Sequence, residues 1–278
     1  MTNPIADPLV EVPDTDLDNT LVQIEATVEG VAMVTINRPA QRNAFDARLI
    51  AALDEAFETL QGAEGVRVVF LRGAGGMFSA GADLDWMREA ADRTESDNRD
   101  DAYGMAKMLK SLWDIPALTV ALVEGGAFGG GAGLAAACDM AIATSDAKFS
   151  FSEVRLGLIA ATISPYVVGA VGPRTARALF ATGQVFDAAY AEKVGLITEV
   201  VADVAALDAA RARLATEMMA CAPGAVADSK KLVEDVAYKP IEDVMEETAK
   251  RIARTRVSRE GQEGVRAFLD KRKPSWAQ

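Results

Sequence analysis

Alternating hydrophobic and polar residues near the start of the chain predict a β-hairpin. Residues 21–27 and 31–36 both show this two-residue period, and Glu29-Gly30 between them is a turn pair. Apolar residues then recur at helical spacing over 47–60, and the mainly apolar run over 66–71 is typical of a buried strand. The chain therefore opens with two strands, a helix and a third strand.

Glycine-rich segments follow two of the predicted strands. The first is the loop 72–82, and the second is the triplet 129–131, which comes after the apolar run 117–123. A helix of small residues is predicted to start at the triplet and to stop near Asp139. Glycines let a ligand approach bare backbone, and a helix N-terminus offers unpaired N–H groups and the positive end of the helix dipole. The centre of the chain is therefore suited to holding a negative charge.

Further elements are predicted on both sides of this centre. A short helix over 83–91 precedes a charged stretch, 92–101, which we expect to form a solvated lid or loop before a helix over 102–112. Past the centre, the pattern predicts strands over 140–144, 148–151 and 197–201, and helices over 163–180 (broken at Gly172-Pro173) and 187–194.

Strand signals stop after residue 203, which indicates a subdomain boundary. The first twenty residues contain five acids and no Lys or Arg, unlike a secretory or transit peptide, and we expect a flexible acidic tail there. Helical patterns after the boundary cover 205–220, 224–237 and 241–268. The predicted organisation is a tail over 1–20, a core over 21–203 and a helical region over 204–278.

The composition excludes several kinds of chemistry. The chain of 278 residues has 41 acids against 29 bases and a net charge of −12, which repels nucleic acid phosphates. It contains no histidine, which excludes a Ser-His-Asp triad, a His general base and a His-bound zinc. Its two cysteines lack metal-ligand spacing and suit a reducing compartment. We therefore expect a cytoplasmic protein that binds no metal, no nucleic acid and no membrane.

The two glycine-rich turns suggest an oxyanion hole. If their strands lie side by side, the N–H groups of Ala82 and Gly130 could point at one oxygen. Two ordinary tight turns are the alternative. Glu153 lies at the end of a predicted strand and before another apolar run, where partial burial would raise its pKa toward the range that proton transfer needs. For Glu153 the alternative is a salt bridge to Arg155 or another base.

A dinucleotide site is the main competing interpretation. The spacing Gly131-x-Gly133-x-x-Ala136 fits the dinucleotide-binding pattern, with Glu153 about 20 residues further on in the place of a ribose-binding acid. Five residues separate the preceding strand from the glycine triplet, and the site is in the middle of the chain. Both facts argue against a nicotinamide-dependent oxidoreductase.

Taken together, motifs along nearly the whole chain resemble the enoyl-CoA hydratase/isomerase (crotonase) superfamily. In that family's order they are Ile36-Asn-Arg-Pro with Asn43-Ala-Phe, Phe78-Ser-Ala-Gly-Ala-Asp-Leu, the glycine triplet, Ala147-Lys-Phe-Ser-Phe-Ser-Glu-Val-Arg-Leu-Gly, and Glu263-Gly-Val-Arg-Ala-Phe-Leu-Asp-Lys-Arg-Lys-Pro. The resemblance implies an α/β fold, the ClpP/crotonase spiral of ββα units, with a C-terminal helical region that forms homotrimers or dimers of trimers. It also implies acyl-CoA thioesters as substrates and no cofactor.

The resemblance assigns roles to individual residues. It implies that Ala82 and Gly130 supply the oxyanion donors and that Glu153 is the catalytic acid-base group. The substrate-binding positions that it implies are Arg42, Ala44, Ala80, Asp83, Leu84, Trp86, Gly129 and Lys273, the last near the nucleotide phosphates.

One position departs from the well-known hydratases of the family. They carry a second glutamate on the helix after the glycine triplet, where this chain has Gly133. A lone carboxylate is compatible with syn addition of water and also with shifting a double bond, so Δ3-Δ2 enoyl-CoA isomerase is an alternative, as are a thioester hydrolase and an acyl-CoA binder. The sequence around Glu153 resembles that of the bacterial methylglutaconyl-CoA and isohexenylglutaconyl-CoA hydratases, which tend to share this glycine. Hydration of a 2-enoyl-CoA, on branched acyl chains, is therefore the first expectation.

Overall fold

The described part of the chain, residues 21–278 of a computed structural model, begins with the expected hairpin. β1 (Val22–Ala26) pairs antiparallel with β2 (Val31–Ile36). The turn requires glycine at position 30, because Gly30 has a φ of +92° and a methyl group there would lie 2.0 Å from the carbonyl oxygen of Gly65. The acidic tail predicted over 1–20 lies outside the described residues.

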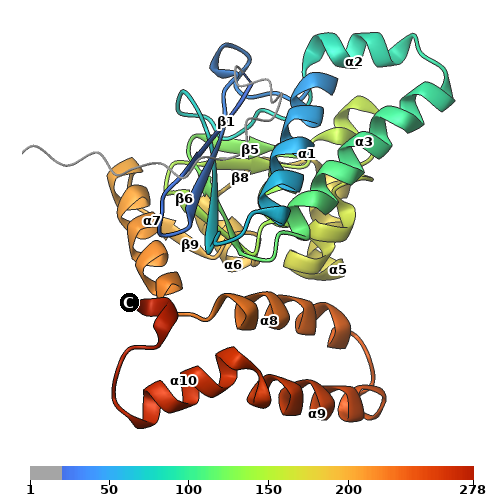
Figure 1. Ribbon diagram of the computed structural model, residues 1–278. Coiled ribbons are helices and arrows are strands. Elements are labelled where there is room, and N and C mark those ends of the chain that lie inside the picture. The colour runs from blue at the N-terminus through green and yellow to red at the C-terminus, as the bar shows by residue number, and fades with distance from the viewer. Residues whose placement is uncertain (1–20) are drawn as a thin grey trace, which may run out of the picture.

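Two sheets run through the molecule (Figure 1). Their further strands are β3 (Val68–Gly73), β4 (Leu118–Val123), β5 (Gly126–Phe128), β6 (Met140–Thr144), β7 (Lys148–Ser150), β8 (Phe186–Asp187) and β9 (Glu199–Val201). The larger sheet has the order β1-β2-β3-β4-β6-β9, and every pair after β1–β2 is parallel. The smaller sheet has the order β5-β7-β8.

The chain passes from one sheet to the other in a repeating way. β4 and β5 follow each other but lie in different sheets, as do β6 and β7. Each of these pairs is followed by a helix, α4 (Gly130–Ala137) or α5 (Ser164–Thr182). This arrangement confirms the expected spiral of ββα units. β8 has only two residues, and β5 is a Gly-Ala-Phe segment inside the glycine-rich region, so neither shows a hydrophobic period that could reveal it.

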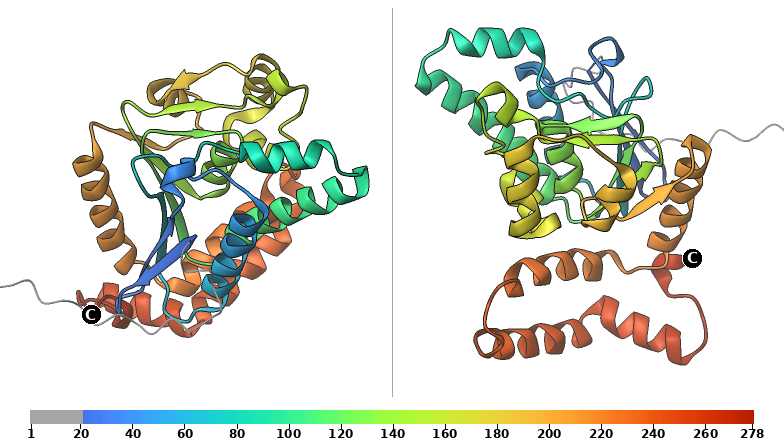
Figure 2. Two further views of the ribbon diagram at one scale, coloured as in Figure 1. Left: turned by 90° about the horizontal axis from the view of Figure 1, so that it is seen from above. Right: turned by 180° about the vertical axis from the view of Figure 1, so that it is seen from behind.

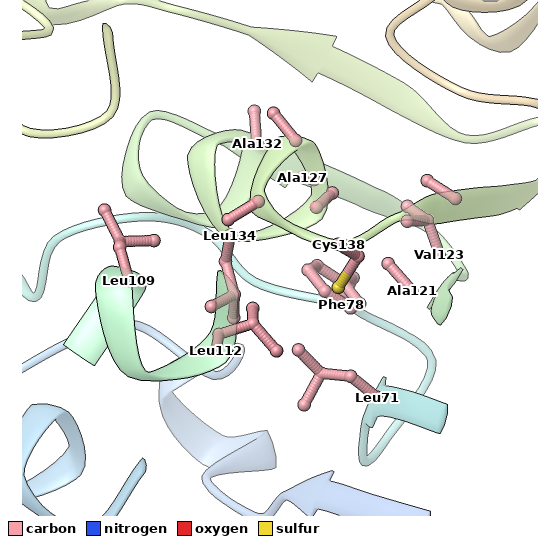
Figure 3. Close-up of a cluster of buried hydrophobic side chains, with 14 of the residues drawn as sticks. Leu71, Phe78, Leu109, Leu112, Ala121, Val123, Ala127, Ala132, Leu134 and Cys138 are labelled. Carbon is pink, nitrogen blue, oxygen red and sulfur yellow. The ribbon is translucent and has the colours of Figure 1, made fainter. Parts of the chain in front are cut away.

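Helices cover both faces of the larger sheet (Figure 2). α1 (Ala47–Gly62) and α3 (Glu95–Trp113) lie on one face, and α7 (Val204–Met219) lies on the other. Because side chains alternate along a strand, Val69 of β3 joins the core under α1 and α3, while its neighbour Val68 packs in a second core with Leu207 of α7. Figure 3 shows part of the first core, where apolar side chains of β3, β4, α3 and α4 meet.

The start of α3 corrects the prediction of a charged loop over 92–101. α2 (Leu84–Ala91) is the expected short helix, but α3 begins at Glu95 rather than at residue 102. Thr94 and Asp97 form a capping box, in which each side chain accepts a hydrogen bond from the other residue's backbone N–H. Most residues of this turn are exposed, so the charged stretch showed no hydrophobic period that could reveal a helix.

The helical region after residue 203 has four long helices rather than three. After α6 (Ala188–Lys193) and α7 come α8 (Pro223–Val236), α9 (Ile241–Val257) and α10 (Arg259–Leu269). The single helix predicted over 241–268 is wrong, because Ser258 interrupts it and its side-chain oxygen accepts from the N–H of Gly261 to cap α10. The expected break in α5 is present at Gly172, which has a φ of +75°.

α8, α9 and α10 form a layer outside the two sheets (Figure 1). Lys230 of α8 anchors it: its Nζ donates to the carbonyl oxygens of Ile115 and Ala117 and lies 2.7 Å from the Asp139 carboxylate. Within these three helices only Ala267 is buried. The apolar side chains that these helices and the turn between α8 and α9 expose are Val233, Tyr238, Ile241, Met245, Ile252, Val257, Val265, Phe268 and Leu269.

The division of the chain at residue 204 stays a prediction. α7 shares a core with the larger sheet, whereas α8, α9 and α10 are almost without buried residues. Among the helices of residues 21–278, none combines the length and the apolar character that crossing a membrane requires.

Candidate functional site

The amide of Ala82 is presented by a short stretch of parallel pairing. Phe45 and Ala82 form a parallel bridge, in which Phe45 N–H donates to the Gly81 carbonyl (2.7 Å) and Asp83 N–H donates to the Phe45 carbonyl (2.8 Å). In this pattern the central residue of the second segment makes neither bond. The N–H of Ala82 therefore points away from Phe45 and has no acceptor among residues 21–278.

The amide of Gly130 is presented by the start of α4. Gly129 precedes the helix with a φ of +49°, and its own N–H is bonded to the Ser150 carbonyl. The first helical bond runs from Gly133 N–H to the Gly129 carbonyl, so the N–H of Gly130 has no partner inside the helix. It lies at the positive end of the α4 dipole.

The two segments that carry these amides touch each other. Gly81 has a φ of +90°, and a methyl group there would lie 2.8 Å from the Phe128 carbonyl oxygen and 3.8 Å from the Gly129 nitrogen. A methyl group on Gly130 would lie 3.3 Å from the ring of Phe45. Phe45 therefore contacts the backbone of both segments, and only glycine at position 81 permits their approach.

Glu153 lies beside the same segments, at the start of η2 (Glu153–Leu156). Its Oε1 is 3.1 Å from the place where a methyl group on Gly129 would be, and its buried Oε2 has no hydrogen-bond partner. Burial raises the pKa of Glu153 above its ordinary value, against a smaller opposing effect of its own backbone N–H. Glu153 forms no ion pair within residues 21–278, so the alternative of a salt bridge to Arg155 is wrong.

A nearly buried arginine joins the same loops in a role that sequence reasoning missed. The sequence placed Arg38 only in the Ile36-Asn-Arg-Pro motif and among the basic residues that could meet phosphates or solvent. The Arg38 guanidinium donates to the Ala44 carbonyl (2.5 Å) and to the Asp83 carboxylate (3.2 Å). Burial opposes ionisation of Asp83, but the N–H groups of Asp85 and Trp86 and the charge of Arg38 outweigh it, and the pKa of Asp83 lies below its ordinary value.

Asn43 is a second residue that sequence reasoning missed. It is fully buried with a φ of +56°, and its Nδ2 donates to the carbonyl oxygens of Ala74 (2.9 Å) and Met77 (2.6 Å). Its Oδ1 accepts from the backbone N–H of Arg38, and its carbonyl accepts from the hydroxyl of Ser79. Asparagine tolerates the left-handed conformation, and its place in the Asn-Ala-Phe motif is the signal that could have found it.

The remaining predicted binding residues fall into two groups. Arg42, Ala44 and Ala80 lie together, since the Ala80 N–H donates to the Arg42 carbonyl at 2.9 Å and the nearby Ala44 carbonyl accepts from Arg38. At the start of α2, Leu84 is 68% exposed, while Trp86 is partly buried. Trp86 lines a cavity of about 210 Å³ together with residues of α1 and α3.

Lys273 is not brought together with the others within one chain. It is exposed, and Trp276 three residues later accepts a hydrogen bond from Arg67 at 3.3 Å through its carbonyl. Arg67 precedes β3, whereas the loop that carries Ala82 follows β3. Lys273 therefore lies toward the opposite end of the larger sheet from Glu153.

Position 133 has no room for a side chain. Gly133 is buried in α4, and a methyl group there would lie 2.0 Å from Cγ2 and 2.4 Å from Cβ of Ile163. Ile163 is itself buried at the start of α5. The side chain of Ile163 therefore fills the space that a side chain at position 133 would need, where the well-known hydratases carry a second glutamate.

The sequence model of the enoyl-CoA hydratase/isomerase family matches residues 26–278. The chain belongs to the enoyl-CoA hydratase/isomerase family. A crotonase-type protein from Legionella pneumophila is 44% identical with a TM-score of 0.87, over 92% of this chain and 99% of that one. An enoyl-CoA hydratase from Shewanella pealeana is 38% identical with a TM-score of 0.87, over 94% of this chain and 98% of that one.

Proteins named for a different reaction are also similar. A carnitinyl-CoA dehydratase from Citrobacter koseri is 30% identical over 249 residues, which cover 87% of this chain and 93% of that protein. Membership of the family therefore agrees with the expectation of a lyase that acts on CoA thioesters, and it leaves the individual reaction to the chemistry of the site.

Gly133→Ala is expected to lower the free energy of unfolding by about 1–3 kcal/mol, because the new methyl group overlaps Ile163. Gly104→Ala in α3 is the matched control: nothing lies within 4 Å of its new methyl group, and alanine is the better helix former. Urea denaturation measures both. The double variant Gly133→Ala/Ile163→Ala should cost less than the sum of its parts, and a Gly133→Ala protein as stable as the control would contradict the packing.

Glu153→Gln is expected to make the protein more stable at neutral pH, because an amide is less costly to bury than a carboxylate. The pKa of Glu153 is raised in the folded state, so the folded protein holds that proton more tightly than the unfolded chain does. Its contribution to stability is present below the ordinary pKa of 4.5 and is lost as the pH rises through the raised pKa.

Thermal unfolding across this pH range tests the difference. The advantage of Glu153→Gln should appear above pH 4.5 and grow until the raised pKa is passed. The exposed Glu64, changed to Gln, is the control and should give little change. An equal effect of both substitutions would show that burial of Glu153 is not the cause.

Proposed function

We propose that this protein hydrates a 2-enoyl-CoA thioester to the 3-hydroxyacyl-CoA. One observation carries the proposal: two unpartnered backbone amides lie on touching segments beside a partly buried carboxylate that has no ion-pair partner among the described residues. In this proposal the amides of Ala82 and Gly130 bind the thioester oxygen, and they stabilise the negative charge that it gains when an enolate forms. Such donors are fixed before the reaction and need no reorganisation during it.

Glu153 carries both proton transfers in this mechanism. Its carboxylate takes a proton from water while the water oxygen bonds to C3 of the substrate, and the electrons of the double bond move to the thioester oxygen. The protonated Glu153 then returns the proton to C2, and the enolate collapses to the thioester. A raised pKa suits both steps, because the group must accept and release a proton near neutral pH. The reaction transfers no electrons between molecules, so we propose no cofactor.

Δ3-Δ2 isomerisation is the second candidate, and the contact between Gly133 and Ile163 favours it. With no carboxylate at position 133, a single acid-base group must carry every proton. Moving a proton from C2 of a 3-enoyl-CoA to C4 requires only one such group. Hydration stays first because the names of similar proteins include an enoyl-CoA hydratase and a carnitinyl-CoA dehydratase. A branched acyl group remains part of the proposal through the resemblance of the Glu153 region.

The nicotinamide-dependent oxidoreductase is not favoured by the geometry. Dinucleotides bind where the strand order of a parallel sheet reverses, and the larger sheet here runs in chain order without a reversal. Gly131 and Gly133, which would be two of its glycines, pack against the side chains of Ser79 and Ile163.

We further propose that CoA lies along the loops around Arg42, Ala44, Ala80, Asp83 and Gly129, with the acyl group toward Leu84 and Trp86. The hydrogen bond from the Ala80 N–H to the Arg42 carbonyl holds the backbone of these loops together. Lys273 would reach the phosphates only from a neighbouring chain, since it lies away from the groove within its own.

Incubation with crotonyl-CoA and with a 3-enoyl-CoA, each followed by the absorbance of the enoyl thioester, separates the two reactions. Hydration consumes the absorbance of crotonyl-CoA, whereas isomerisation creates absorbance from the 3-enoyl-CoA. Glu153→Gln should lower turnover by about two to four orders of magnitude. Unchanged turnover in this variant would rule out Glu153 as the proton carrier, and activity on the 3-enoyl-CoA alone would replace hydration by isomerisation.

The exposed apolar side chains of α8, α9 and α10 support the proposal of a homotrimer or dimer of trimers, because large exposed apolar side chains gathered on one outer layer are typical of an interface. Phe268→Asp would place a charge on a side chain that is 83% exposed in one chain and should shift the protein toward a single chain. Light scattering after size exclusion measures the mass. Val28→Asp, in the turn of the first hairpin, is the control, and equal masses for both variants would contradict this interface.

A further inference from the structure

The Arg38 guanidinium is joined to both sides of the loop crossing that presents the Ala82 amide. It donates to the Ala44 carbonyl at 2.5 Å, and it lies 3.2 Å from the carboxylates of both Asp46 and Asp83. Its side chain is only 10% exposed. A planar guanidinium with several fixed donors can hold three acceptors at once, which an ammonium group on a flexible chain does less well.

Two partners of Arg38 flank Phe45, the residue that contacts the segments of both amides. Ala44 and Asp46 are the neighbours of Phe45 on either side, and Phe45 makes the two backbone bonds that turn the Ala82 N–H outward. The ring of Phe45 also faces Gly130, at 3.3 Å from a methyl group placed there. A shift of Phe45 would therefore change the position of both donors relative to each other.

The second side of the crossing is held by Asp83. Its backbone N–H bonds to the Phe45 carbonyl, one of its carboxylate oxygens receives Arg38, and the other caps α2 through the N–H of Asp85 at 2.9 Å. The hydrogen bonds of Gly81 and Asp83 thus fix Ala82 from both sides, and Arg38 connects the Ala44–Asp46 segment to Asp83.

We infer that Arg38 is a positioning residue for the oxyanion hole: by tying the Ala44–Asp46 segment to Asp83 it sets the direction of the Ala82 amide. This role rests on the proposed function, because it assumes that the amide polarises a thioester carbonyl. Arg38 itself touches no reacting atom. Loss of Arg38 should weaken stabilisation of the enolate and leave the affinity for the CoA part of the substrate unchanged.

The test uses the full-length protein and a conjugated 2,4-dienoyl-CoA, whose absorbance moves to longer wavelength when its carbonyl is polarised. Arg38→Met should lose at least half of the shift that the wild-type protein produces, and kcat should fall by about 10- to 100-fold, as for small misplacements of catalytic groups. The Kd of free CoA, which has no thioester carbonyl, should stay within about two-fold of the wild-type value. Arg38→Lys should recover only part of the shift.

Arg48→Met is the matched control. Arg48 is 71% exposed and meets the same Asp46 carboxylate from outside, at 3.6 Å, but it contacts neither Ala44 nor Asp83. Its loss should leave the shift and kcat unchanged. If Arg38→Met does not fold, Asp46→Asn removes one charged partner while keeping an N-cap for α1, and it should give a smaller loss of the shift.

The outcomes separate the two proposals. A full shift and an unchanged kcat in Arg38→Met would overturn the role of Arg38 while the proposed function stands. A parallel loss of CoA affinity in Arg38→Met would also overturn it, since the whole groove would then depend on Arg38. If the wild-type protein binds the dienoyl-CoA without any shift, no polarising amide exists to be positioned, and both proposals fall.

Discussion

The close approach of two backbone segments at Gly81 and Phe128 is the constraint on which the candidate site depends. The segments belong to different turns of the spiral, and their contact leaves no room for a β-carbon at position 81. Phe45 supports both segments, one through backbone hydrogen bonds and the other through its ring. Because these contacts involve main chain and a fully buried ring, the direction of the amides is set by the fold and not by mobile side chains.

The Glu153 side chain lies beside few groups that could pair with it. No cation among the described residues pairs with its carboxylate, and one of its oxygens has no hydrogen-bond partner, so burying the charged form costs stability and raises the pKa of Glu153. The same absence of a partner is what makes the group able to exchange a proton. Ile163 contributes to this isolation by filling the space over α4, so that acid-base chemistry in the proposed reaction depends on one group.

Much of the fold could be predicted from local pattern, and the failures have physical causes. The hairpin, the apolar strands and the helix after the glycine triplet were predicted because their side chains follow a clear period. β8 was missed because two residues show no period, and β5 because it is a Gly-Ala-Phe segment among glycines. The start of α3 was missed because its first turn is exposed on nearly every side. The break at Ser258 is a cap inside a continuous helical pattern, which periodicity does not register.

The candidate site was only partly visible in the sequence. Glycine spacing indicated that Ala82 and Gly130 could carry free amides, but only coordinates place their segments in contact. Asn43 and Arg38 stood in the quoted motifs, but their roles were missed because some of their partners are backbone atoms or acids far along the chain, up to 45 residues away. A salt bridge for Glu153 was a reasonable alternative by position, and it fails because Arg155 makes no ion pair with it.

The order of the larger sheet has a consequence for how the chain assembles. Each strand from β2 to β9 is added beside the strand of that sheet that precedes it in the sequence, so the sheet can grow from one edge as the chain leaves the ribosome. No strand has to be inserted between two that are already paired. The connections between neighbouring strands differ in length, and the longest, from β6 to β9, contains β7, α5, β8 and α6. Because the entropic cost of closing a loop grows only slowly with its length, even this step remains accessible.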